Sequence, residues 1–147
     1  MSETELPAAP NTAPISVLVV DDNEDNADSL AMLLTTRGYA VAVAYDGETA
    51  IARATADQPE VLLLDIGLSR MTGLEVCGRI RREPWGKAAT IIAISGWGQA
   101  ADLKRSREAG FDAHLVKPVL FDELVNTILR LRESRREKPI ARLAQQE

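Results

Sequence analysis

The chain has 147 residues, a net charge of -5 and no apolar run that approaches the ~20 residues needed to cross a bilayer. Its hydrophobic fraction of 46% is that of a globular domain able to fold alone, and its acidic balance argues against nucleic acid or anionic membrane as a direct partner. A single cysteine, Cys77, excludes an internal disulfide, and we expect it to be a small buried residue of a cytoplasmic protein.

The chain order predicts one α/β domain between two tails. Three prolines among alanine, threonine and glutamate predict a disordered tail over residues 1–14. The folded domain is expected at residues 15–132. Within it, apolar and β-branched runs predict five strands, at residues 15–20, 40–45, 61–64, 90–94 and 113–116. Helical spacing of apolar residues follows each strand. This alternation predicts a doubly wound parallel sheet that is covered on both faces.

Two of the expected helices have polar or thin apolar faces. In the third helix, which opens at Gly73, the arginines are expected to point largely outward: Arg79, Arg81 and Arg82. The fourth helix, roughly residues 99–109, has only Ala100, Leu103 and a few alanines to bury, so we expect it to be loosely held.

Residues 133–147 are expected to form a tail or a stub of linker. Pro139 makes one helix running through to Gln146 unlikely on sequence grounds, because the residue before a proline disfavours helical geometry. The basic residues of this segment, such as Arg135, are almost cancelled by acidic ones. We therefore expect a solvated end and no nucleic-acid patch.

Polar residues stand where the predicted strands end. Asp21 and Asp22 follow the first strand, Asp65 the third, Ser95 the fourth and Lys117 the fifth. The carboxyl ends of parallel strands meet at one edge of a sheet, so these side chains are expected to converge. Carboxylate oxygens completed by water suit Mg²⁺. A lysine ammonium and a serine hydroxyl suit a phosphoryl group carried by Asp65, because a carboxylate can act as a nucleophile toward phosphorus.

Each of these pieces has an ordinary structural explanation when it is taken alone. The pair Asp21-Asp22 could serve only as acidic residues at a helix N-terminus, and Ser95-Gly96 could be an ordinary turn. Lys117-Pro118 could be a loop. Their joint placement at successive strand ends favours the functional interpretation.

The ordered set resembles the receiver domain of two-component response regulators over residues 15–132. The matching segments are Val-Val-Asp21-Asp22-Asn23, Leu-Leu-Leu-Asp65-Ile-Gly-Leu, Met71-Thr72-Gly73, Ile-Ser95-Gly96 and Val-Lys117-Pro118. The resemblance implies the flavodoxin-like fold with strand order 2-1-3-4-5. It also implies that the bond before Pro118 is cis.

The resemblance implies a role for each site residue. Asp65 is the phosphoacceptor, and Asp21 and Asp22 bind Mg²⁺ together with Asp65 and the backbone carbonyl of Gly67. Ser95 supplies a hydroxyl that shifts toward the phosphoryl group. Lys117 contacts the phosphoryl oxygens.

The sequence departs from the family pattern at several positions. Ser69 stands where proline is common and Thr72 where aspartate is common, so the loop after Asp65 is expected to be less rigid. His114 replaces the usual switch aromatic, and we expect a partly exposed strand residue there in preference to a pH sensor. Trp97, with Gly67, is hypothesised to tune hydrolysis of the phosphoryl group, which measurement of its lifetime in a Trp97→Ala variant would test.

The implied function is phosphoacceptance in a phosphorelay. A sensor histidine kinase or a histidine phosphotransfer protein would donate the phosphoryl group to Asp65 with Mg²⁺, and a changed surface would signal to an unidentified target. Beyond its own phosphorylation and dephosphorylation, no enzyme activity is expected. The chain could be a stand-alone regulator or the receiver of a hybrid kinase.

Two rival functions keep the same topology. A haloacid-dehalogenase-like phosphatase would carry its nucleophile after the first strand, whereas Asp65 follows the third. A phosphorylation-independent binding domain would not need the complete set of site residues. Both rivals are therefore disfavoured by the sequence.

Overall fold

A computed structural model describes residues 13–96 and 100–146, so all but the last two residues of the predicted N-terminal tail lie outside the described residues. The elements follow one another in this order: β2 (Ser16–Val20), α1 (Glu24–Thr36), β3 (Ala40–Ala44), α2 (Gly47–Asp57), β4 (Val61–Asp65), α3 (Gly73–Arg82), the 3-10 helix η2 (Trp85–Lys87), β5 (Thr90–Ser95), α4 (Ala100–Ala109), β6 (Ala113–Val116) and α5 (Phe121–Gln146).

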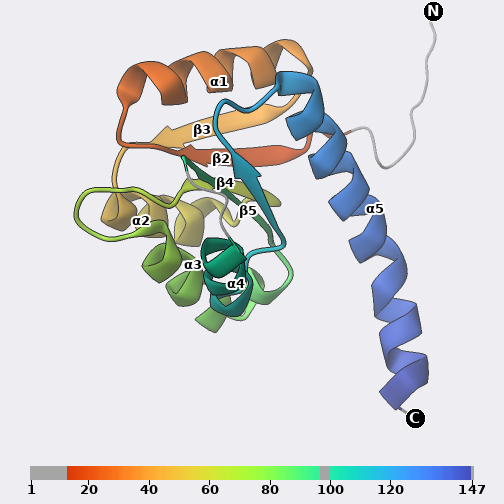
Figure 1. Cartoon of the computed structure of the whole chain (residues 1–147). Coiled ribbons are helices and arrows are strands. Elements are labelled where there is room, and N and C mark those ends of the chain that lie inside the picture. The colour runs from red at the N-terminus through yellow and green to blue at the C-terminus, as the bar shows by residue number, and fades with distance from the viewer. Residues whose placement is uncertain (1–12, 97–99, 147) are drawn as a thin grey trace, which may run out of the picture.

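The five strands form one parallel sheet in the order β3-β2-β4-β5-β6. In chain order this is 2-1-3-4-5, so the predicted fold class is confirmed. All five residues of β4 are buried, as the unbroken apolar run predicted for a strand covered on both faces. Figure 1 shows α1 and α5 on one face of the sheet and α2, α3 and α4 on the other.

The strand residues divide between two apolar layers. Because successive side chains point to opposite faces, Leu62 and Leu64 pack with α2 and α3, whereas Val61 and Leu63 pack with α1 and α5.

Cys77 of α3 is fully buried in the layer formed with α2 and α3, as expected, and burial raises the pKa of its thiol to about 11. In the described part of the chain, no helix has the length and apolar character required to cross a membrane.

Arg81 corrects the expectation that the arginines of α3 point outward. Its guanidinium lies near the amino ends of β5 and β6 and donates to the backbone carbonyls of Gly86, Ala89 and Gly110, at 2.7 to 2.9 Å. It also pairs with the Asp112 carboxylate at 2.9 Å. Helical periodicity placed Arg81 near the polar edge of the helix, but its acceptors come from two separate segments, the one between α3 and β5 and the one between α4 and β6. A long side chain can bury its stem and still satisfy its charge.

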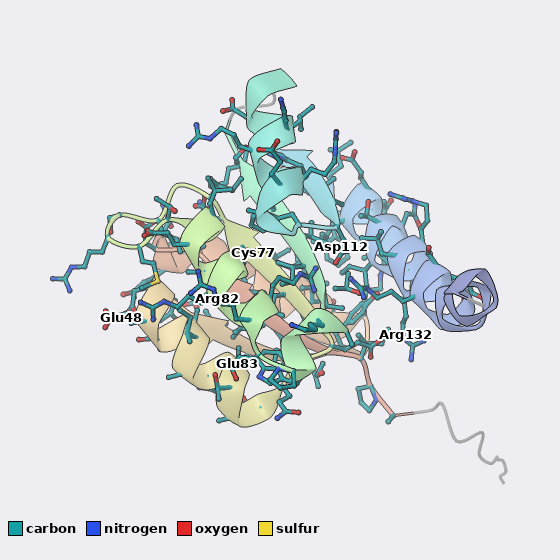
Figure 2. All side chains as sticks on the ribbon, turned by 90° about the horizontal axis from the view of Figure 1, so that it is seen from below. Glu48, Cys77, Arg82, Glu83, Asp112 and Arg132 are labelled. Atoms are coloured by element: carbon teal, nitrogen blue, oxygen red, sulfur yellow. The ribbon has the colours of Figure 1, made fainter. Side chains whose placement is uncertain are left out.

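The helix α5 corrects two expectations for the C-terminal segment, because it continues past Pro139 to Gln146. Ion pairs hold the helix before the proline: Arg132 contacts Glu60 at 2.6 Å and Arg135 contacts Asp112 at 2.7 Å. Figure 2 shows Asp112 and Arg132 on the side of the molecule where α5 lies. These contacts fix the direction of the helix before the proline. A proline inside a helix removes one backbone hydrogen bond and crowds the carbonyl four residues earlier, yet α5 continues past it. Arg135 is therefore not part of a solvated end.

Gly73 is required where α3 begins beside the strand that carries Asp65. A Cβ atom at Gly73 would lie 2.6 Å from the Asp65 carbonyl oxygen and 2.8 Å from the Ile66 Cα. Both contacts are with backbone, which cannot move without displacing the end of β4. The close approach of α3 therefore depends on a missing side chain.

We predict that Gly73→Ala lowers the free energy of unfolding by about 1–3 kcal/mol, because the added methyl group overpacks the strand end. Gly78→Ala in the same helix is the matched control, since its Cβ would meet no atom within 4 Å. Alanine there should raise the free energy of unfolding by about 0.5–1 kcal/mol through helix propensity. Urea denaturation of both variants would measure this, and equal effects would contradict the prediction.

Candidate functional site

The site lies at the carboxyl edge of the sheet, where the parallel strands bring distant residues together. Asp21 follows β2, Asp65 ends β4, Ser95 ends β5 and Lys117 follows β6. Register pairs Val20 with Leu64 and Asp65 with Ile94, so these strand ends are level with one another. The convergence expected from the sequence is present in the structure.

Three carboxylates form a cluster at this edge. One oxygen from each of Asp21, Asp22 and Asp65 lies within 4.8 Å of the others. The Lys117 ammonium lies 3.1 Å from Oδ2 of Asp65 and 3.9 Å from Oδ2 of Asp21. One lysine cation thus faces two of the carboxylates directly. The net negative charge of the group and its hard oxygen donors fit a divalent cation such as Mg²⁺.

Asp65 is held in one orientation by two donors. The side chain is 10% exposed; its Oδ1 accepts the backbone N–H of Gly67 at 2.9 Å, and its Oδ2 accepts from Lys117. Gly67 itself is exposed two residues beyond the strand. Its carbonyl remains a predicted metal ligand.

The other two carboxylates differ in their exposure. Asp21 is nearly buried and accepts the backbone N–H of Asn23 at 2.9 Å, while Asp22 is exposed at the rim. Burial raises the pKa of Asp21, and the neighbouring Asp65 charge raises it further, against the opposing effects of the Asn23 N–H and of Lys117. A cation at the cluster would favour the charged form of Asp21.

Asn23 also begins α1, as predicted. Its side chain accepts the backbone N–H of Asn26, and Glu24 and Asp25 occupy the first turn. The helix cap therefore fixes the direction in which the chain leaves the acidic pair.

Thr72, the last residue of the loop after Asp65, is the N-cap of α3 and is held by hydrogen bonds to that helix. Its hydroxyl accepts the backbone N–H of Glu75, and the Glu75 carboxylate accepts the N–H of Thr72, which together form a capping box. The expectation of a less rigid loop therefore does not extend to its last residue. The peptide bond between Lys117 and Pro118 is cis, as the resemblance implied.

Ser95 and His114 form a contact that the sequence did not predict. The Ser95 hydroxyl lies 2.7 Å from Nε2 of His114, and Nδ1 of His114 lies 3.0 Å from the Ser106 hydroxyl of α4. His114 is partly exposed in β6, as expected. No sequence signal marks Ser106, because its partner comes from a separate element.

Trp97 lies outside the described residues, so its hypothesised role stays a prediction.

Comparison with known proteins assigns the family. The model of the response regulator receiver domain matches residues 17–129. MprA, a response regulator of Mycobacterium tuberculosis H37Rv, is 34% identical over 125 residues, which are 85% of this chain and 53% of MprA. A 14.6 kDa uncharacterized protein of Leptolyngbya boryana is 32% identical over 79% of this chain and 88% of its own length. The chain belongs to the response regulator receiver domain family.

Solved structures agree with this assignment. The chemotaxis protein CheY4 of Vibrio cholerae superposes with a TM-score of 0.77 at 28% identity, covering 80% of this chain and 98% of CheY4. A CheX–CheY–BeF3–Mg²⁺ complex from Borrelia burgdorferi gives a TM-score of 0.74 at 26% identity, covering 80% of this chain and 89% of that one. The chain spans about half the length of MprA.

We predict that Mg²⁺ raises the melting temperature of the protein and that Asp22→Asn removes most of this effect. A ligand at 100 times its dissociation constant stabilises a fold by about 2.7 kcal/mol, and loss of one carboxylate from the cluster would weaken binding. Asp25→Asn is the control, because Asp25 is exposed in α1 and is not a member of the cluster. Equal Mg²⁺ stabilisation of both variants, measured by calorimetry, would contradict the prediction.

Proposed function

We propose that this receiver domain accepts a phosphoryl group on Asp65 from the phosphohistidine of a sensor histidine kinase or a histidine phosphotransfer protein. The observation that carries the proposal is the Lys117 ammonium 3.1 Å from the Asp65 carboxylate, beside two further carboxylates. Asp65 is held in place by its two donors, so its nucleophilic oxygen is oriented. The Lys117 ammonium beside it supplies a positive charge for the incoming phosphoryl group.

In this reaction a carboxylate oxygen of Asp65 attacks phosphorus and forms an acyl phosphate. The bond between phosphorus and the donor imidazole nitrogen breaks, and its electron pair stays on that nitrogen. Lys117 moves from pairing with the carboxylate to pairing with the phosphoryl oxygens, which carry the transferred charge. The backbone N–H of Gly67 holds the carboxylate in position during the attack.

Mg²⁺ is the proposed cofactor. The carboxylates of Asp21, Asp22 and Asp65 would hold it, with the Gly67 carbonyl as a further ligand. When bound, it would neutralise charge on the transferring phosphoryl group. Support comes from the donor set, which consists of hard oxygens, and from the related Borrelia structure, which contains both BeF3 and Mg²⁺.

The proposed output is a change of binding surface, with no catalysis on a separate substrate. The net charge of -5 supports a protein target and disfavours direct contact with DNA. The proposed compartment is the cytoplasm. The surface around α4, β6 and α5 is where the signal is expected, because the Ser95 contact leads to α4 through β6.

We predict that incubation with acetyl phosphate and Mg²⁺ adds one phosphoryl group to the wild-type chain and none to Asp65→Asn. Intact mass spectrometry measures the adduct directly. Lys117→Gln should slow phosphorylation by about 100-fold, because removing one preorganised donor to the developing charge has an effect of this order.

Asp46→Asn is the matched control, since Asp46 caps α2 at the same edge of the molecule and stands outside the carboxylate cluster. It should be phosphorylated like the wild type. If mass spectrometry finds no adduct on wild type, 19F NMR of beryllofluoride binding separates rapid hydrolysis from an inactive site. Absence of both signals would refute the proposed function.

A further inference from the structure

A cavity of about 520 Å³ lies between the turn into α2 and the loop after β4. Residues 45–49 and residues 68–71 line it, together with Glu75 of α3. Both segments follow strands at the carboxyl edge of the sheet, where the backbone carbonyl of Ala44 accepts the N–H of Asp21 at 3.2 Å. The cavity therefore lies at the same edge as the carboxylate cluster, and its size is that of an ordinary ligand pocket.

Local contacts fix the walls of this cavity. Asp46 accepts the backbone N–H of Thr49 at 2.7 Å and the Thr49 hydroxyl at 3.0 Å, which sets the start of α2. Met71 packs against Gly47, where a Cβ atom would lie 2.9 Å from the Cβ of Met71. The cavity is therefore preformed, so a ligand that enters it does not have to order these segments.

The charges around the cavity are mainly negative. Asp46, Glu48 and Glu75 supply three carboxylates, and Arg70 supplies one cation. The hydrogen bonds from Thr49 lower the pKa of Asp46, and Arg70 lowers it further, so this carboxylate is ionised at neutral pH. Glu48 is exposed in the first turn of α2, and Figure 2 shows it at the edge of the molecule. The excess of carboxylates favours a cationic ligand.

An aromatic ring and two apolar side chains complete the lining. Tyr45 is 36% exposed, and its hydroxyl donates to Oδ1 of Asp28 in α1 at 2.6 Å, which holds the ring in place. Leu68 is buried and Met71 is partly buried. An aromatic face attracts a cation, and apolar neighbours suit the methylene stem of a long side chain. The lining therefore complements a cation that is carried on an apolar stem.

We propose that this cavity receives an arginine side chain of a partner protein that docks at the carboxyl edge of the sheet. A planar guanidinium stacks on an aromatic ring such as Tyr45 and donates to surrounding carboxylates, whereas an ammonium is a compact point charge. Arginine is also enriched at protein interfaces. The inference goes beyond the proposed function, because it requires no phosphorylation of Asp65.

Amide ¹H–¹⁵N NMR of the full-length protein with excess Mg²⁺ tests the proposal, with N-acetyl-arginine amide as the probe. We expect saturable shifts of the amides of residues 45–49 and 68–71. N-acetyl-citrulline amide has nearly the same shape without the charge and should shift none of them, and N-acetyl-lysine amide should bind more weakly. Equal shifts with the citrulline probe would refute a cation site. Equal binding of the lysine probe would indicate a general ammonium site and overturn the assignment to arginine.

Substitutions separate the contributions of the lining. Tyr45→Leu should weaken binding of the arginine probe about 2- to 5-fold through loss of the aromatic face, whereas Tyr45→Phe keeps the ring and should retain most of the affinity. Glu48→Gln should weaken binding about 3-fold. Glu108→Gln is the matched control, since Glu108 is exposed on α4 and does not line the cavity, and it should leave the affinity unchanged.

The outcomes are distinguishable. Probe shifts confined to Asp21, Asp22 and Asp65 would place the guanidinium on the carboxylate cluster and overturn the inference. Phosphorylation by acetyl phosphate is a separate measurement, so the proposed function can stand or fall without changing any of these results. If Tyr45→Leu fails to fold, the comparison of the arginine and citrulline probes on the wild type still decides.

Discussion

The pairing of Lys117 with Asp65 is the interaction on which the site depends. A carboxylate that is nearly buried at the end of an apolar strand is costly unless a cation and hydrogen-bond donors compensate for its lost hydration. Here the ammonium lies 3.1 Å away, and the Gly67 N–H supplies the second partner. Among the described residues, Lys117 is the cation that contacts this cluster of three carboxylates, so its positive charge does not balance theirs. The residues of the site therefore fit a further cation.

The fold makes this pairing possible because its strands are parallel. Lys117 is 52 residues from Asp65 in the chain, yet both stand at the carboxyl edge of the sheet. β4 lies at the centre of the sheet with apolar layers on both faces, so Asp65 ends a strand whose residues are all buried. The missing side chain at Gly73 lets α3 start directly against that strand end. The end of β4 therefore both packs against α3 and carries the carboxylate of the site.

The opposite edge of the sheet is tied by a second polar cluster. The Asp112 carboxylate accepts from Arg81 of α3, from Arg135 of α5 and from the backbone N–H of Ile91. One side chain thus connects helices from both faces of the sheet to the start of β5. With α5 held there (Figure 2), the carboxyl edge is free for loops and the site. The two ends of the sheet therefore differ, because ion pairs tie one end to the helices and the other end presents the carboxylate cluster.

The sequence by itself determined the strand order through its resemblance, and it located the acidic cluster and Lys117 through polar residues that follow apolar runs. These features depend on local pattern and on the single rule that parallel strands end at one edge. Tertiary structure decided the rest. The inward turn of Arg81, the helix through Pro139 and the contact of His114 with Ser95 and Ser106 all depend on partners from separate elements. Periodicity reports which face of an element is apolar, but not which distant donor or acceptor will meet a polar side chain, because that choice is made only when the layers pack.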